Sequence, residues 1–403
     1  MSTALGAVLV PGVLPGERVH VGALRRGGGA LRGQVLRIDV ASADRVEPVC
    51  ALADRCGGCP LMPLRLEAQR RLKERWVARA LALPAPMIQA GEGLGYRRQA
   101  RLHFQGDDRG LRLGYRGWRS RALVDVPACP VLAPALGAVL GPLREALVHM
   151  RGDGEVRLSS EGEGGVTVAV EASGPQGPEA YAALEALCGQ EGVSATALRV
   201  GPSTGWARWG RCPDGPPGAL HAPLAAFMQA NAEVNGALID QVITLAAPTG
   251  ARILELYAGH GNLTVHLAAK AASLVAVERD PEAAEACRHN LRDRGLLSPE
   301  GPARVIAADA AAHASGRPVD TVVIDPPRTG ARGVLGAVAK RRPGSIVYIS
   351  CDMATLGRDV GELRAAGYRP DEARAFDMFP HTAHVEAVVR LVPAGRELPR
   401  GQR

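Results

Sequence analysis

Five short apolar segments after residue 250 constrain the fold of this chain more than any other feature. They are ARILELY, SLVAVE, ARVIAAD, DTVVIDPP and GSIVYISC, and segments with helical periodicity separate them. Strands that are apolar along their whole length are typically buried on both faces of a parallel sheet. The alternation therefore predicts an α/β domain with a doubly wound parallel sheet over residues 221–403, closed by a last strand at EAVVRLVP.

Glycines and acids follow these strands. The first strand ends in ELYAGHGNLT, where Gly259 and Gly261 permit a tight turn close to a ligand. Thr264 stands where a dinucleotide fingerprint has its third glycine, which disfavours a pyrophosphate site. The next three strands end in Glu278, Asp309 and Asp325. Each acid alone is an ordinary turn or cap residue, but together, at one edge of the sheet, they indicate an adenosyl ligand such as S-adenosylmethionine rather than NAD.

Cys351 and Glu386 make one reaction feasible at the same edge. Cys351 ends the fifth strand, and Glu386 opens the last apolar run, where a carboxylate without a partner is unusual. A thiolate can add to C6 of a pyrimidine, C5 can then take a methyl group, and a carboxylate can remove the C5 proton before the thiolate leaves. The alternatives are a small core cysteine and a solvated edge glutamate.

A cluster of cysteines lies in the first third of the chain. CALADRCGGC contains Cys50, Cys56 and Cys59, and Cys129 is a fourth candidate in VPACP. In an intracellular protein such a cluster is more often a metal site than a set of disulfides. Zinc usually takes two close pairs of ligands, whereas a triplet with one distant cysteine suits a 4Fe–4S cluster better. Zinc remains the alternative.

Charge and composition narrow the class of partner. Residues 1–130 contain 21 Lys and Arg against 11 Asp and Glu, a net charge of +10, while the remainder is slightly acidic. This asymmetry predicts a polyanion such as RNA bound at one end, with affinity dominated by phosphates. Aromatic residues make up only 3% of the chain, which disfavours a broad stacking surface. No apolar run approaches a membrane span, so we expect a cytoplasmic protein, most simply a monomer.

Four motifs, ELYAGHGNLT, DPPRTGARG, SCDMATLGRD and FDMFPHTAHVE, resemble in order and spacing those of the RNA 5-methyluridine methyltransferases. The resemblance implies a Rossmann-like class I methyltransferase domain with Cys351 as nucleophile and Glu386 as proton acceptor. The residues that it implies for S-adenosylmethionine are Gln229, Tyr257, Gly259, Asn262, Glu278, Asp309 and Asp325. Arg328 is expected near the target uracil or its phosphate. The cysteine spacing resembles the iron–sulfur branch of this family that acts on 23S ribosomal RNA.

Three domains are expected on this basis. Residues 1–48 resemble part of a β-barrel of the TRAM type, reduced relative to the family. Residues 49–220 form a basic α+β central domain with the cluster, and residues 221–403 form the methyltransferase domain. Alternative functions are methylation of a transfer-RNA uridine, and RNA binding by a non-catalytic iron–sulfur protein. Cytosine methylation is disfavoured because Ser350, not proline, precedes Cys351.

Overall fold

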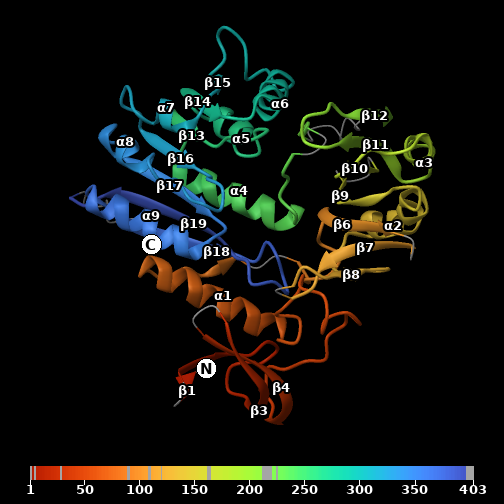
Figure 1. Cartoon of the computed structure of the whole chain (residues 1–403). Coiled ribbons are helices and arrows are strands. Elements are labelled where there is room, and N and C mark those ends of the chain that lie inside the picture. The colour runs from red at the N-terminus through yellow and green to blue at the C-terminus, as the bar shows by residue number, and fades with distance from the viewer. Residues whose placement is uncertain are drawn as a thin grey trace.

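The computed structural model describes residues 2–3, 6–27, 30–88, 91–107, 110–118, 120–160, 165–210, 220–223 and 226–395. Three sheets organise these residues, and Figure 1 shows the eight-stranded sheet, the seven-stranded sheet and the small N-terminal sheet as three separate regions. None of the described helices is both long and apolar enough to cross a membrane.

The eight-stranded sheet carries the segments that define the predicted methyltransferase domain. Its strands, in spatial order, are β15 (Ala303–Ala307), β14 (Ser273–Glu278), β13 (Arg252–Leu256), β16 (Thr321–Ile324), β17 (Ser345–Ser350), β19 (Glu386–Pro393), β18 (Tyr368–Phe376) and β5 (Met87–Ile88). The strands from β15 to β17 are parallel to their neighbours, and β19 is antiparallel to both β17 and β18. The predicted α/β class with a doubly wound sheet is confirmed.

Helices cover both faces of this sheet because its strands are apolar on both sides. One face packs against α4 (Ala232–Ala246), α5 (Thr264–Ala268) and α6 (Pro281–Arg292). The other face packs against α1 (Leu66–Leu81), α7 (Ala310–Ala314), α8 (Leu335–Lys340) and α9 (Met353–Ala365). Neighbouring residues of one strand, such as Ile253 and Leu254, belong to opposite cores, as the alternation of side chains along a strand requires.

Helix α1 and strand β5 precede the central sheet in the chain but pack on the methyltransferase domain. Val77 and Leu81 of α1 are fully buried in the core beneath α9, and β5 pairs in parallel with the end of β18. Figure 1 shows α1 alongside β18 and α9. Within the segment 49–220 that we expected to form the central domain, residues 66–88 therefore extend the neighbouring domain.

The seven-stranded sheet forms the body of the central domain. Its strands, in spatial order, are β12 (Ala207–Gly210), β11 (Val193–Val200), β10 (Val166–Ala172), β9 (Gly152–Ser160), β6 (Gln99–Asp107), β7 (Gly110–Arg116) and β8 (Leu123–Asp125). Helices α2 (Pro134–Leu147) and α3 (Pro178–Cys188) cover one face with an apolar core. The opposite face carries arginines and glutamates, among them Arg157, Glu171 and Arg199, and borders the cleft described below.

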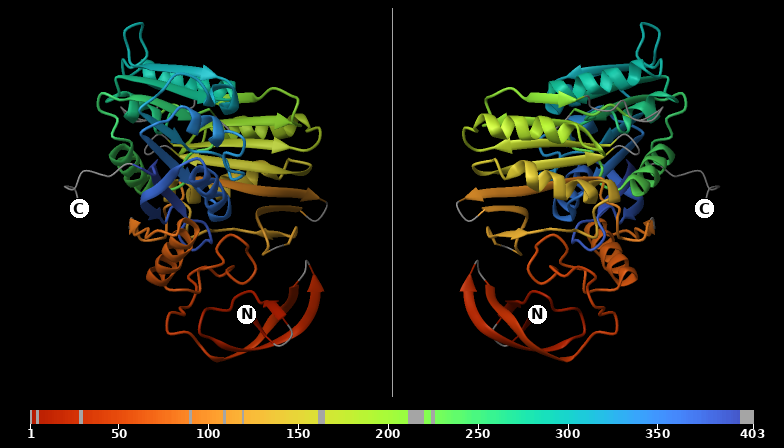
Figure 2. Two further views of the ribbon diagram at one scale, coloured as in Figure 1. Left: turned by 90° about the vertical axis from the view of Figure 1, so that its left-hand side faces the viewer. Right: turned by 90° about the vertical axis from the view of Figure 1, so that its right-hand side faces the viewer.

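The N-terminal sheet has four strands, and it lies at the end of the molecule away from α2 and α3 (Figure 2). The strands are β1 (Ser2–Thr3), β2 (Gly6–Leu9), β4 (Ala30–Val40) and β3 (Arg18–Gly27), in spatial order. Leu14, Leu64 and Ala68 form a small separate core beside it, so the sheet is joined to the start of α1. The assignment of residues 1–48 to a reduced TRAM-type barrel stays a prediction.

Candidate active site

The carboxyl ends of the parallel strands open into a cleft of about 970 Å³ that the open face of the central sheet also borders. All but one of the residues predicted for catalysis and cofactor binding line this cleft: Gln229, Tyr257, Gly259, Asn262, Glu278, Asp325, Cys351 and Glu386. The exception is Asp309, the N-cap residue of α7, whose carboxylate accepts a hydrogen bond from the Ala311 amide at 2.9 Å. Asp309 still lies close enough to contribute to the raised pKa of Tyr257, which burial dominates.

Cys351 and Glu386 lie opposite one another at the ends of two neighbouring antiparallel strands. Ser350 of β17 pairs with Ala387 of β19, and the next residue on each strand toward the cleft is Cys351 or Glu386. Residues opposite each other in an antiparallel pair have closely spaced side chains. The thiol is half-buried, whereas the Glu386 side chain is almost wholly buried, at 4% exposure. The register of the sheet therefore brings together two groups that are 35 residues apart in the chain.

Burial raises the pKa values of the acidic groups in this cleft. The pKa of Glu386 rises to about 8, mainly because of burial and further because of Asp325, whose own pKa burial raises to about 7. Burial, followed by the charge of Glu386, raises the pKa of the Cys351 thiol to about 11. Arg328 opposes these shifts at both Cys351 and Glu386. A carboxyl with a pKa near 8 is suited to accept a proton near neutral pH.

Arg328 lines the cleft, and a buried carboxylate of α9 accepts a hydrogen bond from the loop that carries it. This loop follows Asp325. Asp359 of α9 accepts a hydrogen bond from the Ala331 amide of the loop at 2.8 Å and another from the Tyr348 hydroxyl of β17 at 2.6 Å. Asp359 is fully buried, which fixes the loop against α9. The predicted placement of Arg328 beside the reacting groups agrees with the cleft lining.

The pH dependence of the reaction follows from these groups. Glu386 is protonated below its pKa of about 8 and cannot then accept a proton, so kcat/KM is expected to rise with pH between about 6.5 and 9. In an Arg328→Met enzyme the rise should shift to higher pH, because the opposing positive charge is gone. Profiles of kcat/KM against pH for both proteins test this. A profile that falls over this range, or a variant whose rise shifts to lower pH, would contradict it.

The predicted adenosyl side of the cleft is built from backbone amides and carboxylate oxygens. Glu278 accepts hydrogen bonds from the Gly259 amide at 2.9 Å and the Asp280 amide at 2.8 Å, so it joins the ends of β13 and β14. Gly259 has φ +56°, a left-handed conformation that glycine adopts without strain. Asn262 exchanges two amide hydrogen bonds with Asn235 of α4, both at 3.0 Å. These contacts hold the turn after β13 in place beside the cleft.

The environment of Gln229 could not be predicted from periodicity in the sequence. It precedes the N-cap Asn231 of α4 and is not part of the helix, so it is not the helix surface residue that its pattern suggests. Its side chain is 8% exposed, and its Oε1 atom has no hydrogen-bond partner among the residues that the structure describes. A buried amide oxygen without a partner is costly, so this atom is available to a ligand in the cleft.

Two phenylalanines at the cleft were not predicted from the sequence. Phe379, in the loop before β19, lines this cleft and also the cysteine cavity described next. Phe227, two residues before Gln229, is 65% exposed and lines the cleft as well. Aromatic residues are rare in this chain, so the position of Phe227 close to Gln229 could have drawn attention to it in the sequence.

The four predicted metal-binding cysteines, Cys50, Cys56, Cys59 and Cys129, line one cavity of about 270 Å³ together with Arg97 and Tyr115. Burial, followed by Cys129, raises the pKa of Cys59 to about 12, so thiols from both parts of the sequence are near neighbours. Among the described side chains, no three His, Cys, Asp or Glu groups lie close enough to bind a single metal ion. In a four-iron cluster each thiolate binds a different iron, so the sulfur atoms need not converge on one point.

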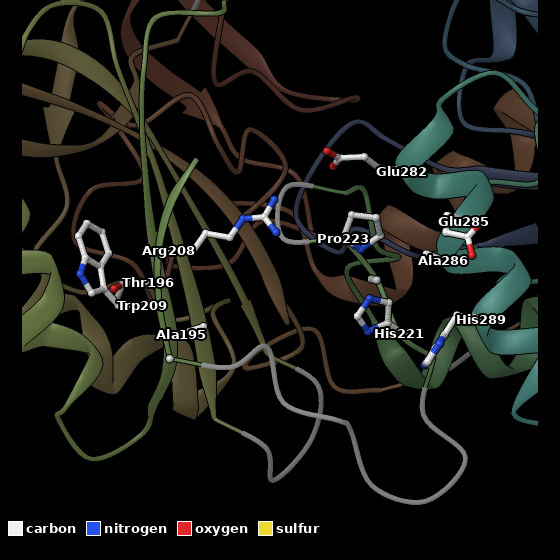
Figure 3. A pocket seen from close by; sticks show the side chains of 12 residues that line it. Ala195, Thr196, Arg208, Trp209, His221, Pro223, Glu282, Glu285, Ala286 and His289 are labelled. Atoms are coloured by element: carbon white, nitrogen blue, oxygen red, sulfur yellow. The ribbon is translucent and has the colours of Figure 1, made fainter. Parts of the chain in front are cut away.

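A third cavity, of about 540 Å³, separates β12 from α6 (Figure 3). Figure 3 shows Arg208 and Trp209 on one side and His221 and His289 on the other. The two imidazole rings meet edge to face, with centroids 5.1 Å apart. None of the predicted site residues lines this cavity, so the reaction is placed in the larger cleft.

The chain is similar to known proteins in both sequence and structure. Residues 221–296 and 315–393 match the family described as tRNA (Uracil-5-)-methyltransferase. A protein of Chromohalobacter salexigens named 23S rRNA (uracil(1939)-C(5))-methyltransferase RlmD is 37% identical, over 98% of this chain and 86% of its own length. A protein of Pectobacterium atrosepticum with the same name is 34% identical, over 94% of this chain and 88% of its own length.

A solved structure has the same overall fold. The tRNA (uracil-54, C5)-methyltransferase of Pyrococcus abyssi, in complex with S-adenosyl-L-homocysteine, superposes with a TM-score of 0.75 at 23% identity, and the match covers 96% of this chain and 95% of the other. At this identity the structural likeness shows the fold alone. The two sequence relatives are 37% and 34% identical and cover 98% and 94% of this chain. The chain therefore belongs to the family of RNA uracil-C5 methyltransferases.

Proposed function

We propose that this enzyme transfers a methyl group from S-adenosylmethionine to C5 of a uridine in 23S ribosomal RNA. The observation that carries the proposal is the pairing of Cys351 with Glu386 in register at the mouth of one cleft. A nucleophile and a proton acceptor at the same edge of one cleft are the two groups that methylation at C5 requires. The names of the relatives support ribosomal RNA as the substrate.

The reaction follows from the chemistry of the two side chains. The Cys351 thiolate adds to C6 of uracil, which forms an S–C bond and moves an electron pair toward C5. Bound S-adenosylmethionine supplies the methyl group that C5 takes, and S-adenosylhomocysteine is the product. The Glu386 carboxylate then accepts the C5 proton, the C5–C6 double bond re-forms, and the Cys351 thiolate leaves.

The methyl donor would be held by groups that the cleft already presents. Glu278, at the end of β14, is placed for the ribose hydroxyls, as acids at this position commonly are. The Gln229 amide oxygen without a partner would accept a hydrogen bond from a polar group of a ligand in the cleft. The other residues that we assign to the donor are Tyr257, Gly259, Asn262, Asp309 and Asp325.

The RNA partner is supported by the charge of the first third of the chain and by the cleft's position. The cleft opens between the methyltransferase sheet and the open face of the central sheet, which presents Arg157 and Arg199. A uracil within a helix could not reach Cys351, so the target must be unpaired or flipped out of its stack. Affinity should fall steeply with salt, because contacts to phosphates dominate it.

The proposal is tested with RNA from a host that lacks this gene. Purified enzyme is incubated with S-adenosylmethionine labelled in the methyl group and with 23S rRNA or bulk tRNA, and 5-methyluridine is mapped by mass spectrometry. Labelled 5-methyluridine at one position of 23S rRNA is the expected result. No labelled 5-methyluridine in either RNA would overturn the proposal.

Methylation of transfer RNA is the second candidate, and the name of the matching family and the Pyrococcus abyssi enzyme favour it. It shares the chemistry at Cys351 and Glu386 and differs only in the RNA that enters the cleft. Label that appears in tRNA alone would keep the reaction and replace the substrate. A non-catalytic role has no support from the cleft, because both reactive groups are present and opposed.

We also propose that Cys50, Cys56, Cys59 and Cys129 hold a 4Fe–4S cluster. Their position around one cavity and the burial of Cys59 support the proposal, and the spacing of one triplet and one distant cysteine favours a cluster over zinc. A cluster would supply cross-links between the loop before α1 and the segment after β8. No step of methyl transfer requires it.

The proposed cluster can be tested by the metal content of the protein, without measuring methylation. Enzyme purified without oxygen is expected to contain iron and acid-labile sulfide in equal amounts, and a Cys129→Ser protein should lose most of both. Cys188→Ser is the matched control, because Cys188 does not line the cavity. Elemental analysis and visible absorption provide the measurement. Zinc without iron in the wild-type protein, or full iron content in Cys129→Ser, would contradict the assignment.

A further inference from the structure

The loop that leads into Glu386 is unusually long for a hairpin. β18 ends at Phe376 and β19 begins at Glu386, and these two residues form the last pair of the antiparallel ladder. Residues 377–385 therefore form one connection between paired strands, whereas hairpin loops commonly contain about 2–5 residues. A loop of this length needs contacts from elsewhere to hold one conformation.

A buried ion pair from α1 holds the start of this loop. Lys73 donates to the Asp377 carboxylate at 2.5 Å and to the Phe379 carbonyl at 3.0 Å. Both Lys73 and Asp377 are 0% exposed, and they lie 304 residues apart in the chain. Arg70, one turn earlier on α1, places its Nε atom 3.7 Å from the other oxygen of Asp377. Asp377 directly follows Phe376, the pairing partner of Glu386.

Further polar contacts hold the middle of the loop. Gln69, one turn before Lys73 on α1, accepts a hydrogen bond from the His381 amide at 2.8 Å and donates to the Leu64 carbonyl at 2.7 Å. His381 has φ +66°, a left-handed conformation that is uncommon for residues other than glycine. The Tyr96 hydroxyl donates to the Pro380 carbonyl at 3.1 Å. Polar groups outside the sheet therefore hold the loop at several points.

The same loop lies between the catalytic cleft and the cysteine cavity. Phe379 lines both the catalytic cleft and the cysteine cavity, and Thr382 and His384 line the cysteine cavity. Moving the loop would move Phe379, which forms part of the cleft wall. A buried ion pair contributes little net stability, because desolvation offsets the attraction, so its presence here indicates that it specifies a geometry.

We propose that Lys73 is a positioning residue for methyl transfer, which orients the 377–385 loop through the Asp377 carboxylate and the Phe379 carbonyl. This inference rests on the proposed function and adds to it a residue outside the cleft. Lys73 does not line the cleft and contacts neither Cys351 nor Glu386 in the hydrogen bonds and ion pairs of the described residues. It acts through the loop that carries Phe379 and ends at Glu386.

The test compares Lys73→Met with a double variant, Lys73→Met with Asp377→Leu. The double variant removes both buried charges and is expected to recover thermal stability, but it still lacks the donor to the Phe379 carbonyl. We expect kcat for RNA methylation to fall about 10-fold or more in both variants. The dissociation constant for S-adenosylmethionine, measured by calorimetry without RNA, should stay within about twofold of wild type, because the loop lies outside the donor's assigned residues.

Arg252→Met is the matched control, because Arg252 forms an exposed ion pair with Asp320 at the opposite end of β13. It should leave kcat unchanged. Recovery of kcat together with stability in the double variant would overturn the proposal, since it would show that the pair is only structural. Loss of kcat only in proportion to lost iron or lost donor binding would overturn it as well.

Failure of the proposed function is distinguishable from failure of this inference. If the wild-type enzyme does not form 5-methyluridine, the function itself is wrong. If the wild-type enzyme forms it and the folded Lys73 variants match its kcat, the positioning role alone is wrong. The double variant keeps the test decisive even if Lys73→Met by itself does not fold.

Discussion

A Cys351→Ala enzyme is expected to lose methylation of its RNA by about 10⁴-fold or more. Without the thiol no covalent bond to C6 forms, and C5 of uracil is then too weak a nucleophile to accept a methyl group at a useful rate. Binding of S-adenosylmethionine and of RNA should persist, because the donor's assigned residues and the basic surfaces are unchanged. Radiolabel transfer measures the first quantity, and filter binding measures the second.

The matched control for this variant is Cys188→Ala. Cys188 is also partly buried and unpaired, but it lies at the end of α3, on the face of the central sheet away from the cleft. Full activity is expected for it. An active Cys351→Ala enzyme would exclude covalent catalysis by this thiol, whatever its effect on folding.

The parts of the fold that local patterns determine could be predicted from the sequence. Short apolar strands alternate with segments of helical periodicity, and this alternation predicted the doubly wound sheet. Glu278 and Asp325 could be placed on one cleft because parallel strands end at the same edge. Cys351 could be placed with them for the same reason. Asp309 shows the limit of the argument, since its side chain caps α7 beside the cleft.

Contacts between distant segments could not be predicted in this way. The sequence gives no periodic signal that Lys73 reaches Asp377 or that β5 pairs with β18, because these contacts depend on how the domains pack. The pairing of Cys351 with Glu386 depends on the register of β19, which is antiparallel in an otherwise parallel region. Gln229 was predicted only by resemblance, and the structure shows that it has a buried amide oxygen without a described partner.

A Glu386→Gln substitution is expected to stop the reaction at a later stage than Cys351→Ala. Glutamine fits the same space and cannot accept the C5 proton, so Cys351 can still add to C6 and the methyl group can still be transferred. The proton then stays on C5, the thiolate cannot leave, and turnover should fall by about 10²–10⁴-fold. The methylated RNA should remain covalently attached to the protein.

Folding of the Glu386→Gln protein can be monitored by its stability. The pKa of Glu386 in the folded protein is about 8, above the ordinary value of 4.5, so folding favours the protonated carboxyl and wild-type stability decreases as pH rises through this interval. Neutral glutamine removes that penalty. The melting temperature of the variant should therefore exceed that of wild type at pH 8.5 by more than at pH 5.

The expected product is a protein–RNA adduct that survives denaturing electrophoresis and carries label from S-adenosylmethionine. In wild-type enzyme the adduct should be absent at steady state, and in the double variant Cys351→Ala with Glu386→Gln it should not form at all, because the bond to C6 requires the thiol. Band intensity against time, with and without S-adenosylmethionine, measures the trapped fraction. A Glu386→Gln enzyme that turns over at the wild-type rate would mean that another group, of which Asp325 is the nearest acidic candidate on the cleft wall, removes the proton. A folded Glu386→Gln enzyme that neither turns over nor forms the adduct would place the loss before proton removal, at addition or at methyl transfer.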